Sequence, residues 1–135
     1  MQLTENFTLE EMTLSSTAKR LRINNNPNRE EIKNLKTLAS SILQPIRDEF
    51  KSPIKIKSGY RNLLLNKAVG GARNSQHLKG EAADINSEDN IRLWKTIIRM
   101  IESKKITVGQ LINEKNLKWI HISLPTTKKN QILTL

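Results

Sequence analysis

Hydrophobic residues recur at steps of three and four along two long segments, which is the spacing of a helix with one buried face. In the first segment, from residue 29 to about residue 50, the stripe expected to face the core consists of Ile32, Leu35, Ala39, Ile42 and Ile46. Asn28 and Glu31 stand where an N-cap and its capping partner are expected, and Pro45 should kink or loosen the last turns. In the second segment, residues 88–103, the residues expected to be buried are Ile91, Trp94, Ile98 and Ile101.

Shorter helices are predicted mainly by the residues at their ends. Thr8 and Glu11 have the spacing of a capping box, so a short helix is expected to follow Thr8. The remaining short elements expected are a helical turn within residues 14–21, a loop over residues 24–28, and a helix over residues 61–69 that Gly70 and Gly71 end.

The rest of the pattern predicts β-structure. Four strands are predicted from alternating or short apolar runs, over residues 54–60, 80–86, 106–113 and 117–124. The last two of these are expected to form a hairpin around the turn NEKN, and residues 126–135 are expected to be a polar tail. Because no linker or repeat divides the chain, we predict a single α+β domain over residues 1–135, with a central, mostly antiparallel sheet.

Composition narrows the classes of partner. The chain has 135 residues, no cysteine and a formal net charge of +10. Disulfides are therefore excluded, and any metal must be held by His, Asp or Glu. The positive charge favours anionic partners such as nucleic acid, an anionic membrane surface or a cell wall, but aromatic residues make up only 4% of the chain and give little support for base stacking. No membrane span and no signal peptide are expected, because neither a long apolar run nor a basic start is present.

One carboxylate stands in an unexpected place. The segment SQHLKGEAADIN, residues 75–86, sets Asp84 within an otherwise apolar run. A buried carboxylate without a partner is costly, so a partner for Asp84 is expected. In the last predicted strand, period two sends Ile120 and Ile122 to the core and His121 to the opposite face.

His77 and His121 are the only histidines of the chain, and together with Asp84 they offer two imidazoles and one carboxylate. This is a donor set of catalytic zinc sites, in which zinc makes a water acidic enough to attack a carbonyl. On these three residues alone the alternative stays open, since a single histidine on a strand is more often a surface residue or one with satisfied hydrogen bonds.

A wider stretch carries a family resemblance. Residues 58–85, SGYRNLLLNKAVGGARNSQHLKGEAADI, resemble the zinc murein peptidases of the D-alanyl-D-alanine carboxypeptidase family, which includes phage endolysins that cut L-alanyl-D-glutamate bonds. The S-x-H-x-x-G-x-A-x-D motif of that family stands here from Ser75 to Asp84, its SGYR element at residues 58–61 and its W-x-H element at residues 119–121. The segments FTLEEM and LQPIRDEF also resemble the branch with an FTL-type start, so the resemblance covers nearly the whole chain.

The resemblance implies a hedgehog-like peptidase fold, Zn²⁺ as the cofactor, and His77, Asp84 and His121 as its ligands. It also implies that Arg61 lies beside the scissile carbonyl, where a guanidinium can stabilise an oxyanion; the alternative is a surface residue that opens a helix. Ser75 is implied to bind the substrate peptide or its terminal carboxylate, and a simple turn serine is an equal alternative.

One position departs from the family pattern. Many members carry an acid three residues before the last histidine, where it serves as general base, and this chain has Lys118 there. A charged lysine cannot accept a proton, and period two points it away from His121. The nearest acid is Glu114, across the predicted hairpin, and the branch that this chain resembles often has a glutamate there. We therefore expect Glu114 to be the base, the alternative being an exposed turn glutamate.

The hypothesis is thus a zinc-dependent metallopeptidase that hydrolyses a peptide bond of the peptidoglycan stem, as a carboxypeptidase or as an endopeptidase, with Glu114 and Arg61 as catalytic residues. We expect a monomer that acts on the cell wall and binds no nucleic acid, either as a phage lysin released through a holin or as part of a phage particle. The alternative, motivated by Lys118, is a non-catalytic wall-binding or structural virion module on the same fold.

Overall fold

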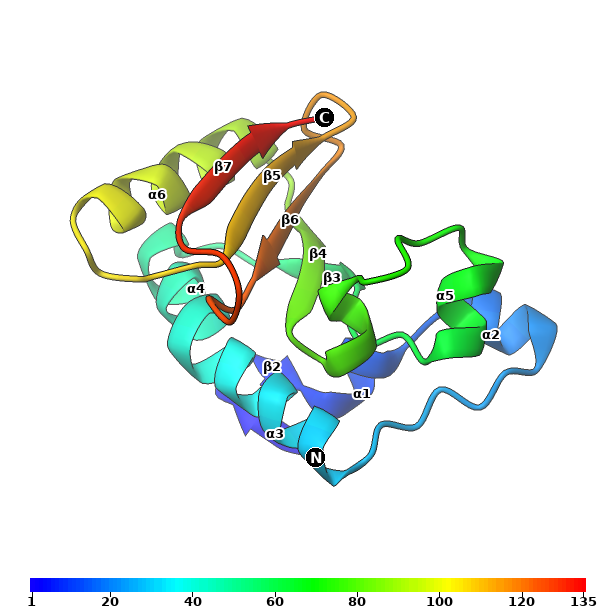
Figure 1. The fold of residues 1–135 in the computed structure, drawn as a ribbon. Coiled ribbons are helices and arrows are strands. Elements are labelled where there is room, and N and C mark those ends of the chain that lie inside the picture. Colours follow the sequence, from blue (N-terminus) through cyan, green and yellow to red (C-terminus); the bar gives the residue numbers. More distant parts are fainter.

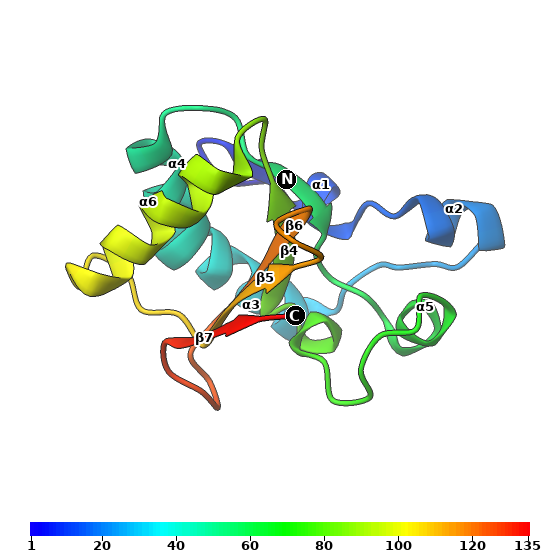
Figure 2. The ribbon, with the colours of Figure 1, turned by 90° about the horizontal axis from the view of Figure 1, so that it is seen from above.

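A five-stranded sheet lies at the centre of the protein, and its two faces have different neighbours (Figures 1 and 2). The computed structural model describes all residues from 1 to 135. The sheet has the strand order β3-β4-β6-β5-β7, with the bounds Lys55–Ser58 (β3), Ala82–Asn86 (β4), Gln110–Glu114 (β5), Trp119–Ser123 (β6) and Gln131–Thr134 (β7). Every neighbouring pair is antiparallel except β5 and β7, so the predicted α+β class and mostly antiparallel sheet are confirmed.

The helices lie on both sides of this sheet. Their bounds are Leu9–Thr13 (α1), Ser16–Leu21 (α2), Arg29–Leu38 (α3), Gln44–Phe50 (α4), Leu63–Ala68 (α5) and Asn90–Glu102 (α6), with a π-helical turn at Ala39–Leu43 (η1) and a 3₁₀ turn at Gln76–Lys79 (η2). Two short strands, Gln2–Thr4 (β1) and Phe7–Thr8 (β2), pair near the N-terminus. Helices α4 and α6 lie on one side of the sheet, and α5 lies on the other (Figures 1 and 2). None of the helices is long and apolar enough to cross a membrane.

The capping residues define the helix starts as predicted. The side chain of Asn28 accepts a hydrogen bond from the N–H of Glu31, and the Glu31 carboxylate accepts one from the N–H of Asn28. The same reciprocal pair joins Thr8 and Glu11 at the start of α1. Pro45 loosens the long helix as expected, because proline has no N–H to donate and the turn before it widens into η1.

The polar tail predicted for residues 126–135 is wrong in its second half. Strand β7 adds to the edge of the sheet beside β5, parallel to it. The N–H of Gln131 donates to the carbonyl of Gly109, and the N–H of Leu135 donates to the carbonyl of Asn113. This segment is too short for its sequence pattern to predict a strand. It is a strand because its backbone pairs with β5.

The predicted burial of α6 is also partly wrong. Ile91 is 61% exposed, and Trp94 and Ile98 are only half-buried. The residues that α6 buries are Leu93, Thr96, Ile97, Met100 and Ile101. Arg92 contributes to the contact between α6 and α4, because its guanidinium stacks 3.8 Å from the Phe50 ring and donates to the Phe50 carbonyl.

The apolar core lies on the α4 and α6 side of the sheet. Ile120, Ile122 and Leu124 of the last hairpin strand are buried there, as period two predicted. Ala83 and Ile85 of β4 join the same core. The intervening side chains of β4 and β6 therefore point to the opposite face, toward the side of the sheet where α5 and η2 lie.

Candidate metal centre

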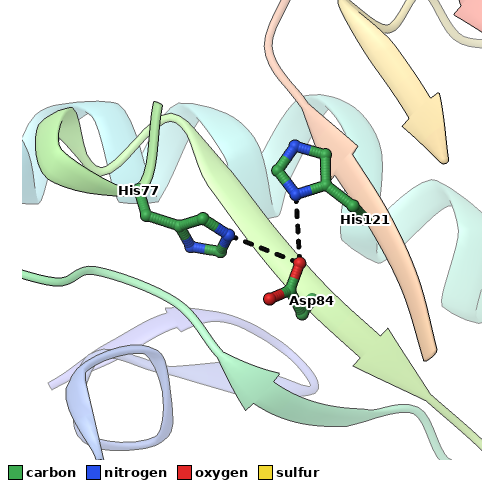
Figure 3. Close-up of side chains that lie close together, drawn as sticks. All are labelled: His77, Asp84 and His121. Carbon is green, nitrogen blue, oxygen red and sulfur yellow. Dashed lines mark hydrogen bonds and ion pairs between the residues drawn. The ribbon is translucent and has the colours of Figure 1, made fainter. Parts of the chain in front are cut away.

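Three elements bring His77, Asp84 and His121 together on the open face of the sheet (Figure 3). Asp84 and His121 are directly opposite each other in the antiparallel pair β4 and β6, so their side chains leave the same face side by side. His77 comes from η2, which Gly80 ends with a positive φ of 74° before the chain enters β4. Figure 3 shows the three side chains pointing toward one another.

The Asp84 carboxylate is the centre of the cluster. Its Oδ1 lies 3.0 Å from Nδ1 of His121 and 3.3 Å from Nε2 of His77. The two imidazole rings meet edge to face, with their centroids 5.2 Å apart. One nitrogen or oxygen atom from each residue lies within 4.8 Å of the other two, and no other group of three such residues meets this condition. Tetrahedral zinc needs ligand atoms about 3.4 Å apart, which the two separations from Asp84 match.

The orientation of His77 favours a cation at this point. Its Nδ1 lies 2.7 Å from the carbonyl oxygen of Gly59 and must donate to it, because a carbonyl can only accept. In a neutral ring Nε2 is then unprotonated, and its lone pair faces the Asp84 oxygen across 3.3 Å. Two acceptors at that distance repel each other unless a second proton on the ring or a metal cation lies between them. A histidine held by a backbone carbonyl at its other nitrogen is also the usual support for a metal ligand.

Asp84 is held in the form that binds metal. Burial by itself would raise its pKa, but the hydrogen bonds and positive charge that His121 and His77 can offer outweigh burial and hold the pKa well below the usual range. The carboxylate therefore stays ionised at neutral pH, and it is the deprotonated carboxylate that coordinates a metal. The partner expected for Asp84 is thus the pair of histidines, together with any cation that they share.

The segment that carries Gly59 is fixed by contacts that the sequence did not reveal. The N–H of Tyr60 donates to the carbonyl of Met12, and a β-carbon on Gly59 would lie 2.2 Å from that carbonyl oxygen, so only glycine fits. Asn25, from the loop before α3, donates to the carbonyl of Tyr60 and accepts from the N–H of Asn62. In the sequence Asn25 is one of several asparagines of the predicted loop, and only the structure shows that its side chain is buried.

Arg61 follows directly on the chain and reaches the same site. Its N–H donates to the carbonyl of His77, and its half-buried side chain lies in the cleft beside Asp84. Burial lowers the pKa of Arg61, and the charge of Asp84 opposes that effect. The Nε–H of the guanidinium is buried and has no acceptor. The guanidinium as a whole lines the cleft, where such a group can donate to a carbonyl or carboxylate of a bound molecule.

Glu114 and Ser75 also line this cleft, which has a volume of about 490 Å³ and contains all six candidate residues. Glu114 is opposite Trp119 in the β5 and β6 pair, one step diagonally from His121 on the same face. Lys118 is exposed and does not line the cleft. Ser75 caps η2, because its Oγ accepts from the N–H of His77. Residues of the cleft that the sequence did not single out include Val69, Ile112 and Lys128.

The protein is an α+β domain that brings two histidines and one aspartate together in an open cleft. This arrangement is typical of metal-dependent hydrolases. The sequence model of the family described as peptidase M15 matches residues 5–123, and the chain belongs to this family. This match confirms the resemblance to zinc murein peptidases, and since M15 peptidases are metal-dependent, the three residues form a candidate metal site. A search among curated proteins finds no match.

Proposed function

We propose that the protein is a zinc-dependent peptidase that hydrolyses a peptide bond in the peptidoglycan stem. The observation that carries the proposal is the convergence of His77, Asp84 and His121 in a cleft that also holds Arg61 and Glu114. Family membership supports a peptidase, and the 3.3 Å approach of Nε2 of His77 to the Asp84 oxygen, which needs a proton or a metal cation between the two atoms, is compatible with a bound cation. In this proposal His77, Asp84 and His121 would hold Zn²⁺, which would supply Lewis acidity to the reaction.

The remaining residues of the cleft position the substrate. Arg61 donates to the carbonyl oxygen of the scissile bond, because its half-buried guanidinium lines the cleft beside Asp84. The Oγ of Ser75 already accepts a hydrogen bond from the N–H of His77, so its own hydroxyl proton is free to donate to a substrate carbonyl or carboxylate. The backbone N–H of Arg61 donates to the carbonyl of His77, and Ser75 caps η2, so both residues are anchored beside a candidate ligand.

Glu114 moves the protons in this proposal. Its carboxylate takes a proton from the attacking water as the carbon–oxygen bond forms, while Arg61 stabilises the charge that develops on the carbonyl oxygen. The protonated Glu114 then gives that proton to the leaving nitrogen as the carbon–nitrogen bond breaks. The products are one peptide with a new carboxylic acid and one with a new amine. The proton of the acid then passes to the amine, which leaves a carboxylate and an ammonium, so atoms and charge balance.

The surroundings proposed for this activity follow from charge and family. A net charge of +10 favours adsorption to an anionic cell wall over a neutral surface. We propose a monomer that acts on the wall as a phage lysin or as part of a virion, with no role for nucleic acid. A second candidate function, a wall-binding or virion module without activity, is favoured by Lys118, which stands where many relatives carry the base.

Mass spectrometry of purified peptidoglycan tests the proposal. The zinc-loaded protein is incubated with peptidoglycan beside a His77→Ala variant, and zinc content is measured in both. We expect new stem-peptide fragments from the intact protein only, with masses that identify the bond. If the intact protein holds one zinc, binds the wall and still releases nothing, the proposed hydrolysis is wrong and the second candidate replaces it.

A further inference from the structure

A second hollow adjoins the cleft of the metal centre, on the side of β3 and α2. Its volume is about 520 Å³, and its wall includes Ser16, Lys57 and Tyr60. Four residues line both hollows, namely Arg61, Val69, Asp84 and Trp119. The two hollows therefore border each other along these four side chains, a boundary that we call the waist, which includes one of the candidate metal ligands and the guanidinium proposed to bind the scissile carbonyl.

The sizes of the two hollows indicate what they can hold. Each has the volume of a site for a drug-sized molecule, which is several times the space that one alanine needs. A peptide bond held at the waist thus has room for further residues on both sides. A carboxypeptidase needs the opposite shape, because the residue that it releases ends the chain and the pocket around it need not extend further.

The placement of positive charge agrees with the shapes. A carboxypeptidase must recognise a terminal carboxylate, and a buried cation at the closed end of the pocket is the strongest means of doing so. Here the half-buried guanidinium of Arg61 is at the waist, between the hollows. The other side-chain cations of the two walls, leaving aside the candidate ligands, are Lys57 and Lys128, and both are exposed. The ammonium of Lys57 lies 4.7 Å from the centre of the ring of Trp119, one of the side chains that line both hollows.

We infer that the protein is an endopeptidase, which binds an extended peptide through both hollows and cuts it at the waist. The inference rests on the proposed function and adds to it the class of bond, one inside a chain and not the last one. The second hollow takes the substrate on one side of the cut, where Lys57 pairs with a carboxylate of the acidic stem peptide. The cleft that holds Glu114 and Lys128 takes the other side.

Blocked peptides test this inference. An N-acetylated stem pentapeptide with a free C-terminus is compared with its C-terminal amide and with a form extended by two residues at that end. We expect the amide and the extended peptide to be cleaved with kcat/KM close to that of the free acid. A carboxypeptidase would lose about 100-fold or more on amidation, because a charged hydrogen bond is lost, and that result would overturn the inference.

Binding provides a readout that does not depend on hydrolysis. Trp119 lies at the waist and the other tryptophan, Trp94, lies on α6 away from both hollows, so a Trp94→Phe variant reports groove occupancy by fluorescence. We expect the amide and the extended peptide to change Trp119 emission at least as strongly as the free acid. If no peptide is cut although zinc is bound, the proposed function fails, and this titration alone decides whether the groove accepts chain on both sides.

A bulky residue placed in the second hollow tests the role of that hollow independently of the metal centre. Ser16→Trp is expected to raise KM for the extended peptide about tenfold or more, with zinc affinity unchanged. The matched control is Ser40→Trp, an exposed serine of η1 outside both hollows, which should leave KM unchanged. Equal KM values for Ser16→Trp and Ser40→Trp would show that the second hollow takes no substrate.

Discussion

At the scale of single residues, the metal centre depends on a backbone oxygen. The carbonyl of Gly59 accepts from Nδ1 of His77 and so leaves Nε2 for Asp84 and a metal. No substitution can remove that carbonyl, but the contacts that hold it come from Met12 and Asn25, far away in the sequence. The orientation of His77 thus depends on Met12 and Asn25, which do not line the cleft themselves.

The proposed base gives the sharpest prediction at this scale. Glu114→Gln keeps the shape of the side chain but cannot take up a proton, so kcat should fall by about 10²–10⁴-fold. Zinc content should not change, since Glu114 is not among the three clustered donors. Initial rates on isolated peptidoglycan and metal analysis of the same sample measure both quantities.

Lys118→Gln is the matched control for Glu114→Gln. Lys118 is exposed and outside the cleft, so kcat should stay at the level of the unchanged protein. Full activity of Glu114→Gln, or a loss of activity in Lys118→Gln equal to that of Glu114→Gln, would remove Glu114 from its proposed role.

Tyr60 makes folding stability sensitive to alkaline pH. Burial, and after it the nearby Glu31 carboxylate, raises the pKa of Tyr60 to about 12 from its ordinary value of 10.0. The folded state therefore keeps a proton that the unfolded state loses between about pH 10 and pH 12, so this contribution to stability is present below pH 10 and disappears across that range. Urea unfolding at pH 8 and pH 11.5 should show a larger loss of stability for the unchanged protein than for Tyr60→Phe. Equal losses would contradict this reading.

At the scale of elements, the position of His77 depends on how η2 sits between α3 and β4. Gly80 ends η2 with a φ of 74°, and a β-carbon there would lie 2.6 Å from the carbonyl oxygen of Glu31 in α3. Asn34 of α3 also donates to the carbonyl of Lys79. The turn that carries a candidate ligand is therefore pressed against the long helix, and a shift of the turn moves the ligand.

Two glycines with the same backbone conformation allow the contact between η2 and α3 to be tested. Gly80→Ala should lose about 2–4 kcal/mol, because positive φ and a backbone clash both oppose it. Gly70→Ala has a similar φ of 73° but nothing within 4 Å of the new carbon, so it should lose only about 1 kcal/mol. Urea midpoints measure the difference, and Gly80→Ala should also bind zinc more weakly. Equal stabilities of the two variants would show that η2 is not held against α3.

At the scale of the whole molecule, the apolar core and the candidate site lie on opposite faces of the sheet. One face of β4 and β6 carries Ala83, Ile85, Ile120 and Ile122 into the core beneath α4 and α6. The other face carries Asp84 and His121 to the cleft. Since adjacent residues of a strand alternate between the faces, a rigid core supports a site only one residue away.

Metal removal should therefore change stability without removing the fold. A metal that binds only the folded state stabilises it by about 2.7 kcal/mol at a free concentration 100 times the Kd. We expect zinc to raise the free energy of unfolding of the unchanged protein, measured by urea titration, by that amount over a sample with EDTA, with similar circular dichroism in both. His121→Ala should show no such difference. A zinc effect of equal size in His121→Ala would place the metal elsewhere.

The sequence by itself determined the parts that depend on neighbours along the chain. The capping boxes at Thr8 and Asn28, the loosening at Pro45 and the two faces of the last hairpin strand all follow from local geometry. The family motifs also selected His77, Asp84 and His121, which the fold does bring together. The sequence did not predict β7, because its pairing partner lies 21 residues earlier, in the register of Gln110 with Gln131. It also did not predict which face of α6 is buried.

Only the tertiary structure decided how the site is supported and shaped. The Gly59 carbonyl behind His77, the Asn25 bridge and the waist between two hollows all join segments that are distant in the sequence. Side-chain patterns report which face of an element is apolar, because burial selects residue type at each position. They do not report which backbone atom from another segment meets that face, since backbone groups are the same in every residue.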